Sequence, residues 1–250
     1  MNYQKAVKDF LRERNYNQIQ LKAVLFDMDG VLYDSMKYHA IAWSNSAKEY
    51  NLHFEEEDAY LHEGRTRIDT INWAYQRQFG RDATKEEIKN IYDLKEKEFN
   101  KFPETTPMDG TKQLLKKIKS NDLISIVVTG SSQESLLNKL EKDYPNTFQS
   151  ESMVTAFDVK QGKPHPEPYL MALKKGGIKP HEALVIENAP LGVESAVAAG
   201  IFTIGVNTGP LNDAILMDAG ANLLFPSMKS LAHQWEDLYK ALNGNGLNKN

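Results

Sequence analysis

Residues 23–31, AVLFDMDGV, contain a short apolar run that is followed at once by two carboxylates, Asp27 and Asp29. Aspartate is depleted in strands, and like charges this close together repel, so stability alone explains the pair poorly. A nearby cation or a shared proton would make the pair tolerable. The same residues also fit a plain strand-to-turn junction with Asp29-Gly30 as the turn, and by itself the pattern does not decide between these interpretations.

Further apolar runs follow along the chain, each with a helical pattern after it. We predict six buried strands, at residues 23–26, 124–128, 153–155, 183–186, 201–206 and 222–225. Strands that are apolar on both faces and alternate with helices indicate a parallel sheet covered on both sides. The predicted fold class is therefore α/β. In such sheets, ligands bind beyond the carboxyl ends of the strands, so we expect the functional residues of this protein to lie there.

The first two strands are separated by roughly a hundred residues, too many for one crossover helix. This interval has no strand-like run and contains three helical patterns, Met36–Tyr50, Arg67–Phe79 and Lys85–Asn100. We therefore predict an all-helical domain inserted into a parallel-sheet core. The predicted division is a helical N-terminal extension at 1–20, the core at 21–34 and 108–243, the insertion at 35–107, and a disordered tail at 244–250.

Polar residues also follow other predicted strands. The second strand ends in Thr129-Gly130-Ser131-Ser132 before a helix, which places a hydroxyl and free backbone N–H groups where anions bind. A later strand is followed by Glu187 and Asn188, and Lys163 lies in the proline-rich loop GKPHPEP. Taken singly, these features fit a helix cap or a solvated lysine. Together, at one edge of a sheet, they indicate a site.

These four segments resemble the motifs of the haloacid dehalogenase (HAD) superfamily, in the same order and at suitable spacing. The matching residues are Asp27-x-Asp29-Gly30-Val31 with Asp34-Ser35, then Thr129-Gly130-Ser131, Gly162-Lys163-Pro164 and Glu187-Asn188. The resemblance covers nearly all of residues 21–231. It implies a Rossmann-like core, and the insertion looks like the small helical cap of the β-phosphoglucomutase and sugar-phosphate phosphatase branch.

The resemblance also implies roles for the catalytic residues. Asp27 would attack a phosphoryl group and form an aspartyl phosphate. Asp29 would act as general acid for the leaving oxygen and then as general base. Lys163 would supply a positive point charge between nucleophile and phosphate. The phosphoryl oxygens would be cradled by Thr129 and by the backbone N–H groups of Gly130 and Ser131.

A Mg²⁺ ion is implied as the cofactor, held by the Asp27 carboxylate, the backbone carbonyl of Asp29 and the fourth motif, Glu187 and Asn188. The fourth motif commonly has Glu-Asp, so Asn188 departs from the pattern. An amide oxygen can still bind Mg²⁺, but one negative charge is missing. We therefore expect weaker metal binding with catalysis retained. The alternative is that Asn188 only caps the following helix.

Four residues of the insertion resemble the β-phosphoglucomutase branch: His39, Trp43, Arg67 and Lys95. His39 and Trp43 are four residues apart and share a helix face, from which they could contact a sugar ring. A buried helix face is the alternative for this pair. Arg67, in Gly64-Arg65-Thr66-Arg67, could grip a distal phosphate because a guanidinium binds phosphate bidentately.

The function expected is a Mg²⁺-dependent phosphohydrolase acting on a small phosphorylated metabolite such as a sugar phosphate. A phosphosugar mutase of the β-phosphoglucomutase type is the alternative, because it shares every core residue. A halide-releasing reaction is disfavoured, since dehalogenase relatives lack the second aspartate, here Asp29. A non-catalytic phosphate-binding module is the remaining reading, and only Asn188 supports it.

Composition excludes several other classes. The chain of 250 residues has no cysteine, which rules out a disulfide framework, a thiolate zinc site and a cysteine nucleophile. It also fits a reducing cytoplasm. The net charge of −4 gives no sign of the basic surface that binding of nucleic acid requires. No run of about 18 apolar residues predicts a membrane span. A monomer or weak homodimer is expected, because residues 1–20 could pack on the core or on a second subunit.

Overall fold

The computed structural model describes residues 2–130 and 135–244. Within them, five parallel strands form one sheet in the order β2-β1-β3-β4-β5. The strands are β1 Ala23–Phe26, β2 Ile124–Val127, β3 Ala183–Glu187, β4 Phe202–Val206 and β5 Leu223–Phe225. Phe26 is paired with Val127 on one side and with Ile186 on the other. The residues that follow these three therefore emerge level with one another at one edge, and the predicted α/β class is confirmed.

The predicted strand at 153–155 is wrong. Val154 forms an isolated bridge beside β2, in which its N–H donates to the Val127 carbonyl at 2.9 Å and its carbonyl accepts from the Thr129 N–H at 2.9 Å. The next residue, Thr155, begins a turn that leads the chain away from β2: the Asp158 N–H donates to the Thr155 carbonyl at 3.0 Å, and the Thr155 N–H donates to Asp158 Oδ2 at 2.8 Å. A side chain that takes the backbone donor competes with sheet formation.

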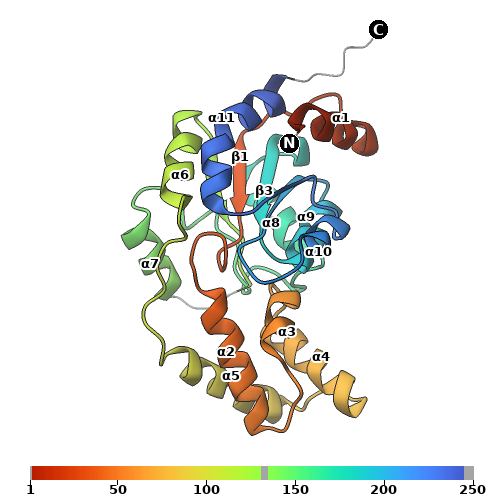
Figure 1. The fold of residues 1–250 in the computed structure, drawn as a ribbon, viewed down its shortest axis with the longest axis vertical. Helices are drawn as coiled ribbons and strands as arrows, with labels where there is room; N and C mark the ends of the chain where they lie inside the picture. Colours follow the sequence, from red (N-terminus) through yellow and green to blue (C-terminus); the bar gives the residue numbers. More distant parts are fainter. Residues whose placement is uncertain (1, 131–134, 245–250) are drawn as a thin grey trace.

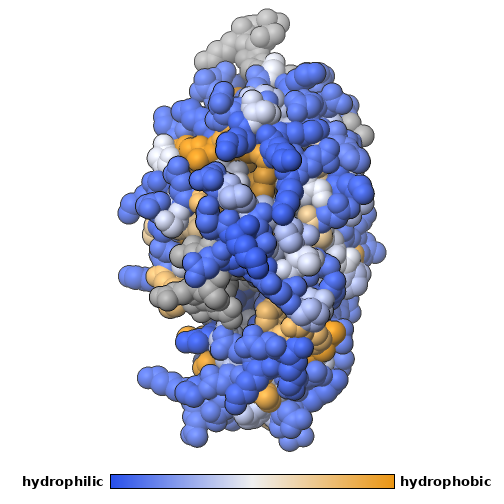
Figure 2. All heavy atoms as spheres, turned by 90° about the vertical axis from the view of Figure 1, so that its left-hand side faces the viewer, coloured by the Kyte–Doolittle hydropathy of each residue, from blue (hydrophilic) through white to orange (hydrophobic). Residues whose placement is uncertain are grey.

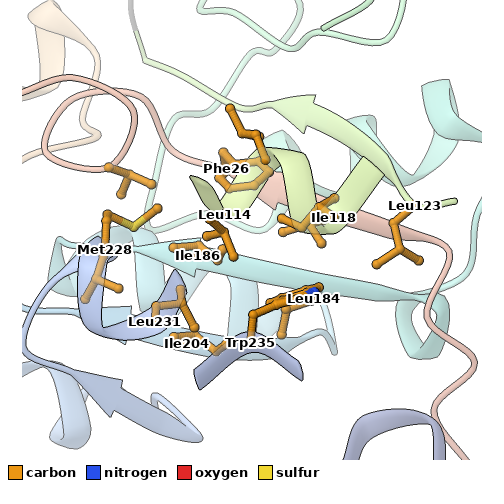
Figure 3. Close-up of a cluster of buried hydrophobic side chains, with 14 of the residues drawn as sticks. Phe26, Leu114, Ile118, Leu123, Leu184, Ile186, Ile204, Met228, Leu231 and Trp235 are labelled. Atoms are coloured by element: carbon orange, nitrogen blue, oxygen red, sulfur yellow. The ribbon is translucent and has the colours of Figure 1, made fainter. Parts of the chain in front are cut away.

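Helices cover both faces of the sheet, because alternate strand residues point to opposite sides. Val24 and Phe26 of β1 belong to one buried cluster, and Ala23 and Leu25 belong to another. The first cluster lies under α6 and α11, as Figure 3 shows for Leu114, Ile118, Met228, Leu231 and Trp235. The core helices are α6 Thr111–Ser120, α7 Ser135–Asp143, α8 Glu167–Gly176, α9 Pro190–Ala198, α10 Asp213–Asp218 and α11 Met228–Gly244, with a 3-10 turn at Pro180–Glu182.

The helical insertion gathers beyond the carboxyl end of β1 (Figure 1). Its helices are α2 Met36–Glu49, α3 Glu56–Leu61, α4 Arg67–Phe79 and α5 Lys85–Phe99. Three of them were expected, but α3 was not, because six residues are too few to show a helical period. A capping box between Glu55 and Asp58 starts α3. A cluster rich in aromatic side chains, including Phe54 and Tyr75, forms the core of this insertion.

The N-terminal extension forms helix α1, Tyr3–Arg14, and it packs on the core of the same chain. Its buried residues are Val7, Phe10 and Leu11, whose spacing places them on one face of the helix. The Phe10 ring meets the Phe202 ring of β4 edge-on, with the centroids 5.2 Å apart. The extension therefore completes the core on the side of α11.

The face turned to the viewer in Figure 2 is largely hydrophilic, with hydrophobic patches of limited size. None of the helices in residues 2–130 and 135–244 combines the length and the apolarity needed to cross a bilayer. Of the predicted disordered tail, Gly244 is instead the last residue of α11, and 245–250 lie outside the described residues.

Replacement of Phe10 tests the packing of α1. Phe10→Ala removes a side chain that is 2% exposed, and we expect it to lower the free energy of unfolding by about 3–5 kcal/mol. Lys8→Ala, on the exposed face of the same helix, is the matched control and should cost less than about 0.5 kcal/mol. Urea denaturation measures both. Equal effects of the two substitutions would contradict the packing described here.

Candidate active site

Asp27, Lys163 and Glu187 form a buried charged triad at the strand ends. The Lys163 ammonium donates to Asp27 Oδ1 and to Glu187 Oε1, each at 2.5 Å, and also to the Val128 carbonyl at 3.3 Å. Exposed fractions are 4% for Asp27, 3% for Lys163 and 0% for Glu187. Burial disfavours a charged lysine, yet the two carboxylates outweigh it and raise the pKa of Lys163. The triad therefore contains a firmly protonated lysine.

Glu187 is fully engaged within this triad. Its Oε1 also accepts from the Tyr169 hydroxyl at 2.7 Å, and its Oε2 accepts from the backbone N–H groups of Asn188 at 3.1 Å and Ala189 at 3.4 Å. Tyr169, on α8, was not singled out by the sequence. Glu187 thus acts here as a hydrogen-bonding hub that orients Lys163, and its direct binding of a metal stays a prediction.

The positive charge of Lys163 does not fully compensate the buried carboxylate of Asp27. Burial and the neighbouring carboxylates of Glu187 and Asp29 outweigh Lys163, and together they raise the pKa of Asp27 to about 8. A carboxylate intended as a nucleophile must be ionised near neutral pH. A further cation near Asp27 would favour its ionised form.

Asp29 turns toward the insertion, where hydrogen bonds link it to His39 and Lys95. Its Oδ1 accepts from Ser35 Oγ at 2.5 Å and lies 3.2 Å from His39 Nε2, while Lys95 Nζ lies 2.9 Å from His39 Nδ1. Burial and Lys95 lower the pKa of His39, so the ring is neutral. A neutral ring with its proton on Nε2 satisfies both contacts. The ring also stacks on Phe99, with centroids 4.2 Å apart.

A cavity of about 760 Å³ lies between the core and the insertion. It is lined by predicted site residues from both, namely Asp27, Asp29, Thr129, Gly130, His39, Trp43, Arg67 and Lys95. Lys163, Glu187 and Asn188 are buried at the strand ends and are not part of the cavity wall. Ser131 lies outside the described residues. The structure thus brings the sequence-predicted residues to one place.

Trp43 and Arg67 combine packing with exposure to the cavity. Trp43 packs against Phe54, with ring centroids 5.8 Å apart, and the Lys95 ammonium lies 5.6 Å from its ring. Its helix face is therefore partly a buried face, as the alternative interpretation held. Arg67 is exposed and lies over the Tyr92 ring at 5.1 Å.

Glu63 is a residue of the site that sequence reasoning missed. Its Oε2 accepts from Asn188 Nδ2 at 2.8 Å, while Glu63 Oε1 and Asn188 Oδ1 are buried and have no hydrogen-bond partner among residues 2–130 and 135–244. Burial, with Asp27 and Glu187 nearby, raises the pKa of Glu63 well above its usual value. The one signal in the sequence is an acidic residue directly before Gly64. Asn188 does not cap α9, whose N-cap is Ala189, so that alternative is wrong.

The turn that carries Glu63 lies directly on the core motifs. Gly64 has a φ of +87°, and a Cβ there would stand 2.6 Å from Lys163 Cδ. A Cβ on Gly162 would stand 2.9 Å from Thr66 Cγ2. The close approach of the turn therefore requires glycine on both sides.

Lys95 gives the cavity a pH dependence. Burial lowers its pKa to about 8, so the ammonium is charged below that pH and neutral above it. In the Asp27→Asn protein, where residue 27 cannot ionise over the same range, we expect the dissociation constant of sulfate, whose charge is constant here, to rise by about three- to tenfold between about pH 7 and about pH 9 as the Lys95 charge is lost. Calorimetric titration measures it. Lys95→Arg, which keeps its charge, should remove most of the rise, and an unchanged rise in that variant would contradict the assignment.

Comparisons with known proteins agree with this geometry. The haloacid dehalogenase-like hydrolase family matches residues 24–206 of the chain. Hexitol phosphatase A of Escherichia coli strain K12 is 32% identical over 189 residues, which are 76% of this chain and 84% of that protein. β-Phosphoglucomutase of Bacillus subtilis strain 168 is 27% identical over 224 residues, which are 86% of this chain and 96% of that protein.

A solved structure gives a closer match. The protein named "Putative beta-phosphoglucomutase from Bacteroides vulgatus" is 56% identical, with a TM-score of 0.93 over 96% of this chain and 98% of that chain. The family match spans all the motifs that converge at the cavity, so the resemblance seen in the sequence is confirmed. The chain belongs to the haloacid dehalogenase-like hydrolases, and it is an enzyme of their phosphatase and phosphoglucomutase type.

Proposed function

We propose that this enzyme is a Mg²⁺-dependent phosphohydrolase that acts on a small phosphorylated metabolite, such as a sugar phosphate, through an aspartyl phosphate on Asp27. One observation carries the proposal: Asp27 lines the cavity while its Oδ1 is held 2.5 Å from the buried ammonium of Lys163. A carboxylate fixed in this way can attack a phosphoryl group that enters the cavity. Water then splits the mixed anhydride in a second step.

The neighbouring residues fit the remaining steps. Asp29 lines the cavity, and although burial acts against it, His39, Ser35 and Lys95 together lower the pKa of its carboxyl group, so it is ionised. The ionised group can take the proton of the attacking water, and its proposed role as general acid requires that it first bind a proton, which it then gives to the leaving oxygen. Thr129 and Gly130 line the cavity at the end of β2, where backbone and hydroxyl donors could bind the phosphoryl oxygens. Ser131 keeps its proposed role in this cradle.

Mg²⁺ fits the residues present. Among the described side chains, no three of His, Cys, Asp or Glu form a ready metal cluster, but Mg²⁺ needs only one or two carboxylates with other oxygens. Asn188 Oδ1 has no hydrogen-bond partner within the described part of the chain, and the pKa of Asp27 is raised; both features favour a cation here. Asp27, the Asp29 carbonyl, Asn188 and Glu187 would hold it, and Glu187 also accepts from Lys163 and from the Asn188 N–H. Bound Mg²⁺ would polarise a phosphoryl oxygen.

The alternative is a phosphosugar mutase. Relatives named as a phosphatase and as a β-phosphoglucomutase both match this chain. The two reactions differ in whether water or a second sugar hydroxyl takes the phosphoryl group from Asp27. The third reading, a non-catalytic binding module, is overturned by the family match. The domain division at 35–107 and a monomer or weak homodimer remain proposals.

Asn188→Asp tests the metal site without an activity assay. The new carboxylate would stand about where Asn188 Nδ2 now meets Glu63 Oε2 at 2.8 Å. We expect a loss of about 1–3 kcal/mol of stability in chelator, seen as a fall of several degrees in melting temperature. Mg²⁺ should then stabilise the variant more than the wild type, because a carboxylate replaces an amide as ligand. In the matched variant Asn188→Asp with Glu63→Gln, the loss in chelator should disappear. An equal rise in melting temperature on addition of Mg²⁺ in all three proteins would contradict the assignment of Asn188 as a metal ligand.

The proposed function is tested with phosphate esters. The wild type should release phosphate from p-nitrophenyl phosphate in Mg²⁺, and Asp27→Asn should reduce kcat by about 10³-fold or more because the nucleophile is lost. Asp34→Asn, at a partly exposed carboxylate paired with Lys37, is the matched control and should keep the activity.

A panel of glucose 1-phosphate, glucose 6-phosphate, a hexitol phosphate and inorganic pyrophosphate identifies the substrate. Free phosphate and conversion between the two glucose phosphates are scored together. Interconversion without phosphate release would favour the mutase, and silence across the panel would refute both activities.

A further inference from the structure

Phe157 places an exposed aromatic ring on the wall of the cavity. At 77%, it has the largest exposed fraction of any large hydrophobic residue within residues 2–130 and 135–244. Apolar side chains stabilise a fold when they are buried, so this ring contributes little to stability. Ile68 on α4 lines the same cavity from the insertion and is 48% exposed. The cavity therefore offers apolar surface to a ligand in addition to charged groups.

Single exposed apolar side chains are common on protein surfaces, but hydrogen bonds fix the turn that carries this one. The Asp158 N–H donates to the Thr155 carbonyl at 3.0 Å, and the N–H and hydroxyl of Thr155 donate to Asp158 Oδ2 at 2.8 and 2.9 Å. The Phe157 N–H donates to Thr155 Oγ1 at 3.3 Å. Lys175 on α8 ties the turn to the core, because its ammonium donates to Asp158 Oδ1 at 2.7 Å and to the Met153 carbonyl at 2.6 Å. A residue on such a turn loses little backbone entropy when it binds a ligand.

The aromatic rings of the insertion are less available to a ligand. His39 stacks on Phe99, with the centroids 4.2 Å apart, and Trp43 packs against Phe54, with the centroids 5.8 Å apart. Both rings line the cavity, but part of each is covered by its partner. Among the described aromatic residues of the cavity wall, Phe157 thus exposes the largest fraction of its surface.

The turn of Phe157 begins beside the proposed phosphoryl cradle. Val154, the residue before the turn, forms a bridge with Val128. Its carbonyl accepts from the Thr129 N–H at 2.9 Å, and Thr129 belongs to the cradle. A substrate whose phosphoryl group occupies the cradle must place the rest of its structure in the remaining cavity. Phe157 lines that space.

We propose that Phe157 is a specificity-determining residue whose ring packs against the apolar face of a cyclic sugar in the substrate. A pyranose has one face formed largely of C–H groups, and packing that face on an aromatic ring removes apolar surface from water on both sides. The inference deepens the proposed function and rests on it. The favoured substrates are phosphate esters of cyclic sugars rather than of open-chain polyols.

Binding of matched ligands tests this proposal without turnover. The Asp27→Asn protein, which lacks the nucleophile, is titrated calorimetrically in excess Mg²⁺ with glucose 6-phosphate, with its open-chain counterpart glucitol 6-phosphate and with inorganic phosphate. We expect glucose 6-phosphate to bind more tightly than glucitol 6-phosphate. Adding Phe157→Ala should weaken binding of glucose 6-phosphate by about three- to tenfold and binding of each of the other two ligands by less than about twofold.

Two further variants separate a ring contact from other effects. Phe157→Tyr keeps an aromatic ring and should retain the preference for glucose 6-phosphate. Phe79→Ala is the matched control, because Phe79 is also an exposed phenylalanine, at 49%, but is not part of the cavity wall. It should leave all three dissociation constants unchanged. The melting temperature of Phe157→Ala should match that of its parent protein, because an exposed ring contributes little to folding.

Three results would overturn the proposal: glucose 6-phosphate binding no tighter than glucitol 6-phosphate, an equal effect of Phe157→Ala on all three ligands, or a selective loss of glucose 6-phosphate in Phe79→Ala. Failure of the proposed function would show separately, as absence of phosphate release by the wild type across the ester panel, since the titration needs no catalysis.

Discussion

The shared ammonium of Lys163 is the contact on which the site depends. It binds Asp27 after β1 and Glu187 at the end of β3, each at 2.5 Å, and the Val128 carbonyl after β2 at 3.3 Å. Three strands that are distant in the sequence are thereby tied together at one point. Burying one ammonium with two carboxylates stabilises a fold less than apolar packing of equal volume would. Phosphoryl-transfer chemistry, rather than stability, accounts for the arrangement.

Charge is divided across the cavity. Asp27 and Asp29 line the cavity at the strand ends, and Arg65, Arg67 and Lys95 line it from the insertion. The wall also includes Glu63, Asp69 and Glu104 from the insertion and Lys139 and Lys160 from the core. A cation near the carboxylates and an anionic substrate facing the arginines would neutralise both sides. The net charge of −4 does not reveal this division, because a site responds to charges within about 10 Å rather than to the sum over the chain.

The sequence by itself determined the α/β core, the helical insertion and most of the residues at the strand ends. Apolar runs and helical periods arise from local chemistry, and the carboxyl ends of parallel strands must meet at one edge. Asp27, Thr129 and Glu187 could therefore be placed together before any coordinates were known. The expectation failed at residues 153–155, where a turn between Thr155 and Asp158 leads the chain away from β2 after a single bridge at Val154.

Only the tertiary structure decided how the insertion meets the core. Asn188 and Arg65 lie in sequence motifs, but their hydrogen-bond partners Glu63 and His62 are marked by no period or motif, and Glu63 is 125 positions from Asn188. Whether a carboxylate is ionised was also beyond the sequence, because burial and neighbouring charges set its pKa. Sequence motifs identify the groups available for catalysis, whereas distances and desolvation determine what those groups can do.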